Sequence, residues 1–278
     1  MSESHPQPPR LVSETHWVSS PAGRLFAQIW WPAACQPTLA AHVPLVLFHD
    51  SLGCVALWRD FPAALARATG RPVLAYDRLG FGRSDARPEP LKALPLPKHF
   101  VEDEALHSFP LIKAALGLDR FIAFGHSVGG GMAAFCAKHQ PVHCLGLITE
   151  SAQAFVEERT RAGVLEAKAG FADPAQLERL GRYHADGKAR WVLDAWTETW
   201  LSPGFADWTL LEAMQALPCP HLALHGSEDE FGSTRHPELL QQWSGGKTQV
   251  QIIEGCQHVP HREREGEVLA RLRKFLAV

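Results

Sequence analysis

A serine flanked by glycines is the first feature of this sequence that could carry chemistry. Residues 125–129 read GHSVG, with Ser127 in the middle, and apolar runs precede and follow them. A serine hydroxyl becomes a good nucleophile when it is exposed and lies beside a base that takes its proton. A sharp turn between a strand and a helix provides that exposure, and small flanking residues permit its tight geometry. The pattern therefore predicts that Ser127 is an activated nucleophile.

A histidine near the end of the chain is the predicted base. His258 follows the last expected strand, at residues 250–254, and from there it can reach the sheet edge where Ser127 would lie. His261 is the alternative, although it lies beyond Pro260 and closer to the final helix. Position therefore favours His258 among the fifteen histidines.

A carboxylate that holds the imidazole in the productive tautomer would complete a catalytic triad. The segment GSEDE, residues 226–230, follows another expected strand and contains three consecutive acids. Asp229 is favoured because it stands in a Gly-x-x-Asp turn, whereas Glu228 and Glu230 are expected to face solvent. Glu150, at the end of a different expected strand, is a further alternative for this acid.

These residues need a sheet that brings the ends of several strands together. Short apolar runs read as buried strands at residues 44–49, 71–77, 121–125, 144–149, 221–225 and 250–254. Helical patterns lie between them, at residues 56–69, 102–116, 130–139 and 265–276. This alternation is typical of an α/β protein with a mostly parallel sheet. Residues 15–31 look like an antiparallel hairpin at the first edge of that sheet.

One stretch, residues 153–205, interrupts the alternation, because it contains helical patterns and no convincing strand. Trp191, Trp196 and Trp200 are spaced by five and four residues, which puts them on roughly one helical face. A helical lid above Ser127 has to line a pocket, so this face predicts a substrate with an apolar or aromatic portion.

Composition and charge narrow the classes of partner. The chain has 278 residues, 46% of them hydrophobic, and a net charge of −3, which gives no electrostatic reason to expect nucleic acid. Residues 1–14 read as a disordered tail without the apolar core of a signal peptide. No apolar run is long enough to span a bilayer. We therefore expect a cytoplasmic protein with a small-molecule substrate and no membrane partner, whose oligomeric state the sequence leaves open.

The remaining patterns predict no cofactor and no metal. The six cysteines lie mostly in apolar runs, so we interpret them as small buried hydrophobes and not as disulfide partners. No histidine or cysteine cluster has the spacing of zinc ligands. The glycines of residues 77–84 resemble a nucleotide loop only superficially, since the G-x-G-x-x-G fingerprint is absent.

Five motifs in order resemble the α/β-hydrolase superfamily, from about Trp17 to Leu276. They are HDSLG at residues 49–53, DRLGFGRS at 77–84, GHSVG at 125–129, GSED at 226–229 and HVPH at 258–261. The resemblance implies an α/β-hydrolase fold with a mostly parallel eight-stranded sheet flanked by helices. It implies a core of residues 15–152 and 206–278 with a helical cap of residues 153–205. The chain order of Ser127, Asp229 and His258 is the one expected for the triad of this fold.

The resemblance also implies an oxyanion hole, for which we assign the backbone N–H groups of Ser51 and Val128. Members of the family usually have a glycine after the histidine of the first motif, but this chain has Asp50. A carboxylate facing an oxyanion would be harmful, so we expect Asp50 to point away from it. The pocket is expected to include three residues of these motifs and three cap aromatics, namely His49, Asp50, His126, Trp191, Trp196 and Trp200.

These expectations together indicate a carboxylesterase-like serine hydrolase that cleaves an ester, or a related acyl bond, of an apolar or aromatic small molecule. The same triad could instead cleave a carbon–carbon bond or a lactone in aromatic catabolism, or transfer the acyl group to another acceptor. A non-catalytic small-molecule receptor of the same fold is the alternative from a different class. Dehalogenase and epoxide hydrolase chemistry is disfavoured, because both need an aspartate where this chain has Ser127.

Overall fold

The expected hairpin forms the first edge of the sheet in the computed structural model, which describes residues 11–277 except 34 and 36. β1 (Leu11–Ser20) pairs with β2 (Gly23–Pro32) in antiparallel register, Leu11 opposite Pro32 and Ser20 opposite Gly23. The tail predicted for residues 1–14 is therefore too long, because residues 11–14 belong to β1, where backbone pairing with β2 holds them. Residues 1–10 lie outside the described part of the chain.

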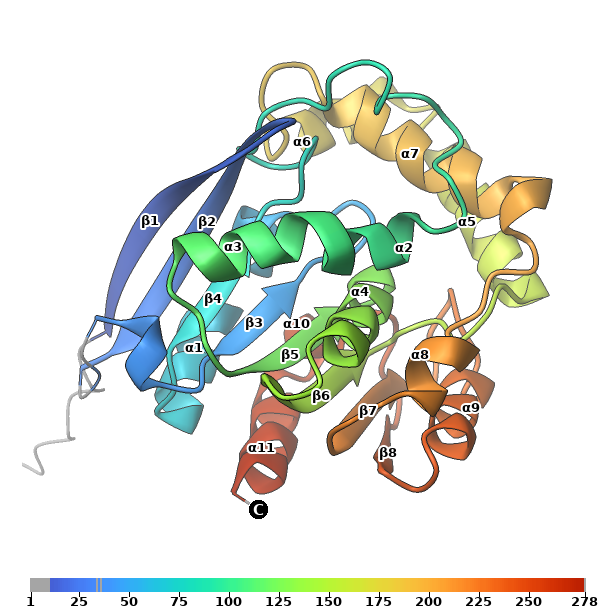
Figure 1. Ribbon diagram of the computed structural model, residues 1–278. Coiled ribbons are helices and arrows are strands. Elements are labelled where there is room, and N and C mark those ends of the chain that lie inside the picture. Colours follow the sequence, from blue (N-terminus) through green and yellow to red (C-terminus); the bar gives the residue numbers. More distant parts are fainter. Residues whose placement is uncertain (1–10, 34, 36, 278) are drawn as a thin grey trace, which may run out of the picture.

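The remaining strands form one parallel array beside this hairpin (Figure 1). The sheet has eight strands in the order β1-β2-β4-β3-β5-β6-β7-β8. The strands β3 to β8 run parallel to one another, and β4 pairs with β2 in antiparallel register. The bounds are β3 (Leu45–Phe48), β4 (Val73–Tyr76), β5 (Phe121–His126), β6 (Cys144–Glu150), β7 (His221–Gly226) and β8 (Thr248–Ile253). The α/β-hydrolase fold expected from the sequence is confirmed, with its mostly parallel eight-stranded sheet.

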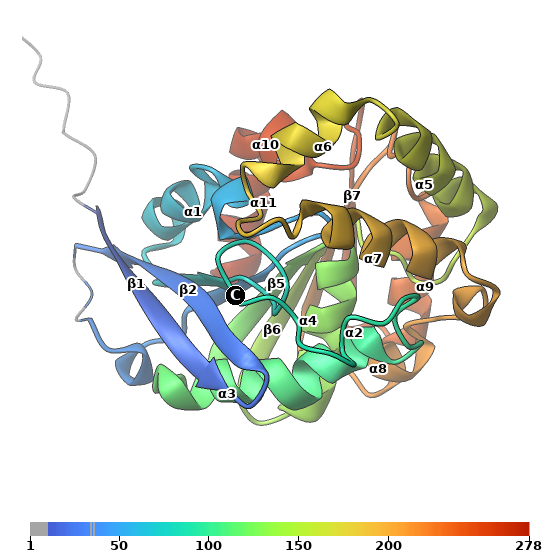
Figure 2. The same cartoon turned by 90° about the horizontal axis from the view of Figure 1, so that it is seen from above.

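Helices cover both faces of the sheet (Figure 2). Side chains alternate along each strand, so Phe121 and Ala123 of β5 join one apolar cluster while Ile122 and Phe124 join the other. The second cluster also holds apolar residues of α1 (Phe61–Thr69) and α11 (Glu265–Leu276). The first holds residues of α3 (Phe109–Ala115), α4 (Val128–His139), α8 (Leu211–Gln215) and α9 (Arg235–Trp243). This burial on both faces explains the continuous apolar runs.

Two expected helices are divided where proline interrupts the backbone ladder. The pattern at 102–116 forms α2 (Phe100–Asp103), a π-helical turn (Glu104–Ser108) and α3. Pro110 has no backbone N–H to donate to residue 106, and the wider turn accommodates its ring. Likewise, the pattern at 56–69 forms a 3-10 turn (Val55–Trp58) and then α1, with Pro62 in its first turn.

The segment between β6 and β7 carries the helices expected at residues 153–205. They are α5 (Glu158–Gly170), α6 (Pro174–Gly181) and α7 (Ala189–Leu201), followed by a 3-10 turn (Pro203–Phe205), and they arch over one end of the sheet (Figure 1). The chain leaves and re-enters the core at one place, where Phe155 bridges Thr209 and Leu210 N donates to Ala154 O at 2.8 Å. None of the helices in the described residues is long and apolar enough to cross a membrane.

Candidate active site

The turn between β5 and α4 holds Ser127 in a conformation that side chains rarely adopt. Its φ is 55°, in the left-handed region. A Cβ on Gly125 would lie 2.1 Å from the carbonyl oxygen of Gly129, and a Cβ on Gly129 would lie 2.1 Å from that of Phe48. Glycine is thus required at both flanks, because backbone atoms fill the space. Ser127 N donates to Glu150 O at 2.8 Å, which ties the turn to β6.

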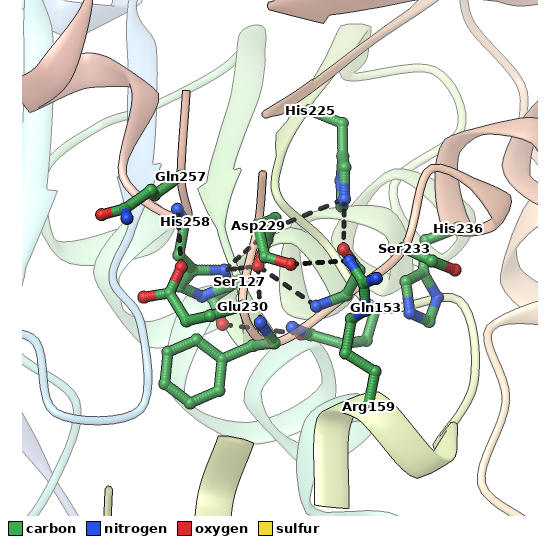
Figure 3. Close-up of polar contacts among 12 residues, drawn as sticks. Ser127, Gln153, Arg159, His225, Asp229, Glu230, Ser233, His236, Gln257 and His258 are labelled. Carbon is green, nitrogen blue, oxygen red and sulfur yellow. Dashed lines mark hydrogen bonds and ion pairs between the residues drawn. The ribbon is translucent and has the colours of Figure 1, made fainter. Parts of the chain in front are cut away.

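The turns after β7 and β8 bring Asp229 and His258 together. His258 Nδ1 lies 2.8 Å and 2.9 Å from the two carboxylate oxygens of Asp229. Asp229 is fully buried, and its Oδ1 also accepts hydrogen bonds from the backbone N–H groups of Phe231, at 2.8 Å, and Gly232, at 3.1 Å. In Figure 3, the Asp229 carboxylate is linked to His258 and also to His225, whose Nε2 lies 3.6 Å away. The aspartate is therefore held rigidly beside the imidazole.

The charges of this pair support one another. Burial alone would raise the pKa of Asp229, but the nearby His258 imidazole and the hydrogen bonds to the carboxylate lower it to about 2. Burial alone would lower the pKa of His258, but Asp229, and to a smaller extent Glu230 and Asp50, raise it above its usual value. Asp229 is consequently ionised at neutral pH, as an orienting carboxylate must be.

Ser127 and His258 line the same cavity, although no hydrogen bond joins them. The Ser127 hydroxyl lies 3.5 Å from Gln153 Oε1, and Gln153 is a buried residue that follows β6. Nucleophile–base hydrogen bonds are often long before substrate binds, so this geometry is compatible with a proton transfer to His258. Sequence reasoning missed Gln153, because a single glutamine after a strand carries no pattern.

Two backbone N–H groups near Ser127 are free to donate. Among the described residues, none accepts a hydrogen bond from Val128 N, which opens α4, or from Ser51 N, which lies in the turn after β3. The carbonyl of Asp50 accepts from Arg78 Nη2 at 2.6 Å and lies 2.9 Å from His49 Nδ1. Because a trans peptide unit directs its C=O and N–H oppositely, these bonds orient the Ser51 N–H away from Arg78.

The Asp50 side chain folds against its own turn and also faces the cavity. A Cβ on Gly53 would lie 1.9 Å from Asp50 Oδ1, so the carboxylate occupies the space over that glycine. Asp50 is half-buried and is one of the cavity-lining residues. Asp50 thus lies among the residues that line the cavity, where the pocket prediction placed it, and Gly53 leaves the room that its carboxylate occupies. That the carboxylate points away from the oxyanion stays a prediction.

The cavity that contains Ser127 has a volume of about 250 Å³ and lies between the carboxyl ends of the parallel strands and the helices α5 and α7. Apolar side chains dominate its upper wall. They come mainly from the helical segment and the turns around it, and include Leu52, Val164, Ala167, Phe171, Trp196, Trp200, Phe231 and Val259. The cavity is suited to an apolar group of modest size.

Three residues expected in the pocket do not line this cavity. Trp191 packs on the turn after β4 instead, with its ring 5.6 Å from that of Phe81 and its Nε1 donating to Lys92 O at 3.1 Å.

His49 does not line the cavity either, because its Nε2 accepts from Arg78 N at 3.2 Å. His126 packs against Trp58 and His261 instead, and its Nε2 lies 2.9 Å from the carbonyl oxygen of His258. Neighbouring residues in a turn or strand point in different directions. A residue next to a motif in the sequence therefore need not face the cavity.

The alternative acid and base form a second buried pair. His261 Nδ1 lies 2.5 Å from Glu150 Oε2, and burial raises the pKa of Glu150 to about 7 while lowering that of His261 to about 3. With His126 they form a group of potential metal ligands whose atoms lie within 4.8 Å of one another. The sequence analysis missed this group, because its members come from three separate elements. Since Glu150 and His261 bind each other, neither takes the place of Asp229 or His258.

The motif at residues 77–84 is a structural turn. The buried Asp77 carboxylate accepts from the backbone N–H groups of Val55, at 2.6 Å, and Arg83, at 2.7 Å. Ser84 Oγ donates to the carbonyl of Asp77 at 2.6 Å. Arg78 of this turn supports the turn after β3, where it donates to the carbonyl of Asp50. That role was not recognised from the sequence.

This constellation of an elbow serine, a buried Asp–His pair and free N–H groups agrees with the comparison to protein families. The family described as the alpha/beta hydrolase fold matches residues 43–200, more than half of the chain. The chain belongs to the α/β-hydrolase family.

Curated relatives of this α/β hydrolase match it over only part of this chain and part of their own length. The human "1-acylglycerol-3-phosphate O-acyltransferase ABHD5" is 35% identical over 127 residues, which are 46% of this chain and 34% of the relative. The bovine "(Lyso)-N-acylphosphatidylethanolamine lipase" is 35% identical over 103 residues, 37% of this chain and 28% of the relative. The chain thus spans about a third of the length of the curated relatives that it matches.

Solved structures resemble the whole of this α/β hydrolase. A hydrolase from Pseudomonas aeruginosa superposes with a TM-score of 0.70 at 22% identity, covering 95% of this chain and 99% of that one. The carboxylesterase CesB from Bacillus subtilis superposes with a TM-score of 0.68 at 18% identity, covering 95% and 92%. These likenesses show the common fold.

Proposed function

We propose that this α/β hydrolase cleaves a carboxylic ester of an apolar or aromatic small molecule through an acyl-enzyme on Ser127. The observation that carries the proposal is the shared cavity, into which the elbow serine and the Asp229-bound His258 both open. The names of an esterase and a lipase among the similar proteins support the same class of reaction. The apolar wall supports an apolar acyl or alcohol portion.

The proposed mechanism has two halves. His258 takes the Ser127 proton as the hydroxyl oxygen attacks the ester carbonyl, and the N–H groups of Ser51 and Val128 stabilise the oxyanion. The C–O bond to the alcohol then breaks, and the alcohol leaves with the proton from His258. Water, deprotonated by the same imidazole, attacks the acyl-enzyme and releases the acid and Ser127. Asp229 keeps the imidazole in the required tautomer throughout.

Acyl transfer to another acceptor is a second candidate, which the name of the ABHD5 relatives favours. It shares the first half of the mechanism and differs in the nucleophile that resolves the acyl-enzyme. Product analysis with an added alcohol separates the two, because a transferase forms a new ester faster than it forms the free acid.

Replacement of the nucleophile tests the proposal. Ser127→Ala should abolish hydrolysis of short p-nitrophenyl esters without unfolding the protein, and Asp229→Asn should lower kcat by a factor on the order of 10⁴. Steady-state kinetics on both variants, with circular dichroism as the folding control, provide the measurement. Retention of most of the wild-type rate by folded Ser127→Ala would contradict the proposal.

A further inference from the structure

The cavity beside Ser127 is negatively charged. Two carboxylates, those of Asp50 and Glu230, line it from opposite turns, after β3 and after β7. No lysine or arginine is among its lining residues in the described part of the chain, and His258 is the one residue there that can carry a positive charge. Any bound molecule therefore meets a net negative wall.

Both carboxylates have capacity for a ligand. No described residue donates a hydrogen bond to the Asp50 carboxylate, which is half-buried over Gly53. Glu230 is more exposed, and its Oε2 accepts from the backbone N–H of His258 at 3.2 Å, which holds the carboxylate beside that residue (Figure 3). A half-buried carboxylate without a partner is partly dehydrated and gains free energy when a cation pairs with it.

Aromatic rings complete the same wall. Phe171, Trp196, Trp200 and Phe231 line the cavity, and the rings of Trp196 and Phe231 meet edge to face with centroids 5.7 Å apart. The face of an aromatic ring attracts cations, and several such rings together bind quaternary ammonium groups. Aromatic rings beside carboxylates thus form an environment that accepts an apolar cation better than either a neutral or an anionic group.

We propose that the substrate of this site is a small ester that carries a positively charged ammonium group, bound between the carboxylates of Asp50 and Glu230 and the aromatic wall. This inference rests on the proposed ester cleavage and specifies its substrate class. An anionic substrate would be repelled by both carboxylates. The cavity volume of about 250 Å³ limits the substrate to a small one.

A bound cation would also assist the base. The negative charges of Asp229, Glu230 and Asp50 raise the pKa of His258 and so favour its protonated form, which cannot accept the Ser127 proton. An ammonium group near Asp50 and Glu230 offsets their effect and lowers the pKa of His258 in the complex. The charge of the substrate thus favours the neutral form of His258, which is the form that starts cleavage of the ester.

The test compares esters that differ in charge but not in shape. Butyrylcholine and 3,3-dimethylbutyl butyrate differ only by nitrogen in place of the quaternary carbon, and a carboxylate-bearing butyrate ester of similar size provides the anionic member. We expect kcat/KM at least tenfold higher for the cationic ester than for the neutral one, and lowest for the anionic one. Equal or lower kcat/KM for the cationic ester would overturn the inference.

Substitutions that remove a negative charge show which carboxylates cause the preference for the cationic ester. Asp50→Asn and Glu230→Gln should each reduce the ratio of cationic to neutral kcat/KM several-fold, and the double variant should bring it close to one. Glu228→Gln is the matched control, because Glu228 is an exposed acid of the same turn that does not line the cavity. It should leave the ratio unchanged, and a ratio that all three substitutions reduce equally would indicate a general charge effect and contradict the assigned site.

A binding measurement separates the two proposals. If Ser127-dependent hydrolysis of the neutral ester occurs without preference for the cation, ester cleavage stands and the cation inference fails. If neither ester is cleaved, ester cleavage fails, and calorimetry of choline and 3,3-dimethylbutanol with Ser127→Ala tests the cation site alone. At least tenfold tighter binding of choline supports that site, and equal binding overturns it.

Discussion

At the scale of single residues, the chemistry depends on which proton His258 carries. Its Nδ1 faces Asp229, which is fully buried and has a pKa of about 2, so the carboxylate is ionised throughout the working range. Burial opposes the imidazolium, but the surrounding carboxylates outweigh burial and raise the pKa of His258 above the ordinary value of 6.5. Because general-base catalysis needs the neutral imidazole, this pKa sets the acid limb of the activity.

The pH dependence of kcat/KM for a neutral ester should therefore rise with an apparent pKa above 6.5. Asp50→Asn removes one of the negative charges that raise this pKa, so the midpoint should move to lower pH. The exposed acid Glu228 provides the control, since Glu228→Gln should leave the midpoint in place. A midpoint below 6.5, or one that Asp50→Asn does not move, would contradict this assignment.

At the scale of elements, two adjacent turns cooperate to present the oxyanion donor. The turn after β4 places the buried Arg78 so that it donates to the carbonyl of Asp50, in the turn after β3. The neighbouring N–H of Ser51 is thereby directed away from Arg78 and left without an acceptor among the described residues. A donor held in advance stabilises an oxyanion without reorganisation when the charge develops.

Arg78→Met should lower kcat for ester hydrolysis by roughly ten- to a hundred-fold with a smaller change in KM, because removal of a whole oxyanion donor costs about 10²–10³. Arg83→Met is the matched control, since Arg83 is an exposed arginine of the same turn and stacks over Phe26, away from the cavity. Steady-state kinetics with a denaturation midpoint for each variant provide the measurement. A rise in KM at unchanged kcat would show that Arg78 acts on substrate binding instead.

At the scale of the whole molecule, the helical segment is joined to the core through His184. Gly82 N donates to its Nδ1 at 2.9 Å, and its Nε2 lies 3.0 Å from the carbonyl oxygen of Leu52, which it can reach only as a donor. His184 must be neutral for both bonds, and burial lowers its pKa to about 4. Other buried histidines behave alike, with pKa values lowered to about 4 or about 3, namely His126, His236, His221 and His261.

These buried neutral histidines predict that the folded protein loses stability in acid. As the pH falls from 6.5 toward 4, the unfolded chain binds protons at these histidines and the folded protein does not, so the free energy of unfolding decreases. Each contributes up to about 1.4 kcal/mol per pH unit. The raised pKa values of His258, Glu150, Asp77 and Glu104 oppose the trend, but these groups are fewer than the five histidines.

Urea denaturation between pH 7 and pH 4.5 measures the effect. The midpoint should fall steeply with pH, and His184→Gln should make the dependence shallower. His107→Gln serves as the control, because His107 is exposed to 73% and should not affect the slope. A midpoint that is constant or rises toward pH 4.5 would contradict the assignment of these histidines as neutral.

Much of the fold and the centre of the site could be predicted from the sequence, because local physical rules govern them. Continuous apolar runs mark strands that are buried on both faces, and the glycines of residues 125–129 mark a turn that backbone atoms crowd. The positions of His258 and Asp229 after strands of a parallel sheet predict that they lie at its carboxyl edge. These inferences need only periodicity, chain direction and backbone geometry.

Tertiary structure alone decided which groups pair and which face the cavity. It joined Asp229 to His258 and Glu150 to His261, although the sequence offered several acids and two histidines. It placed Trp196 and Trp200 at the cavity and Trp191 against Phe81, although the sequence put all three on one helical face. Such pairings join residues far apart in the chain, and burial fixes side-chain direction only when every neighbouring element is in place.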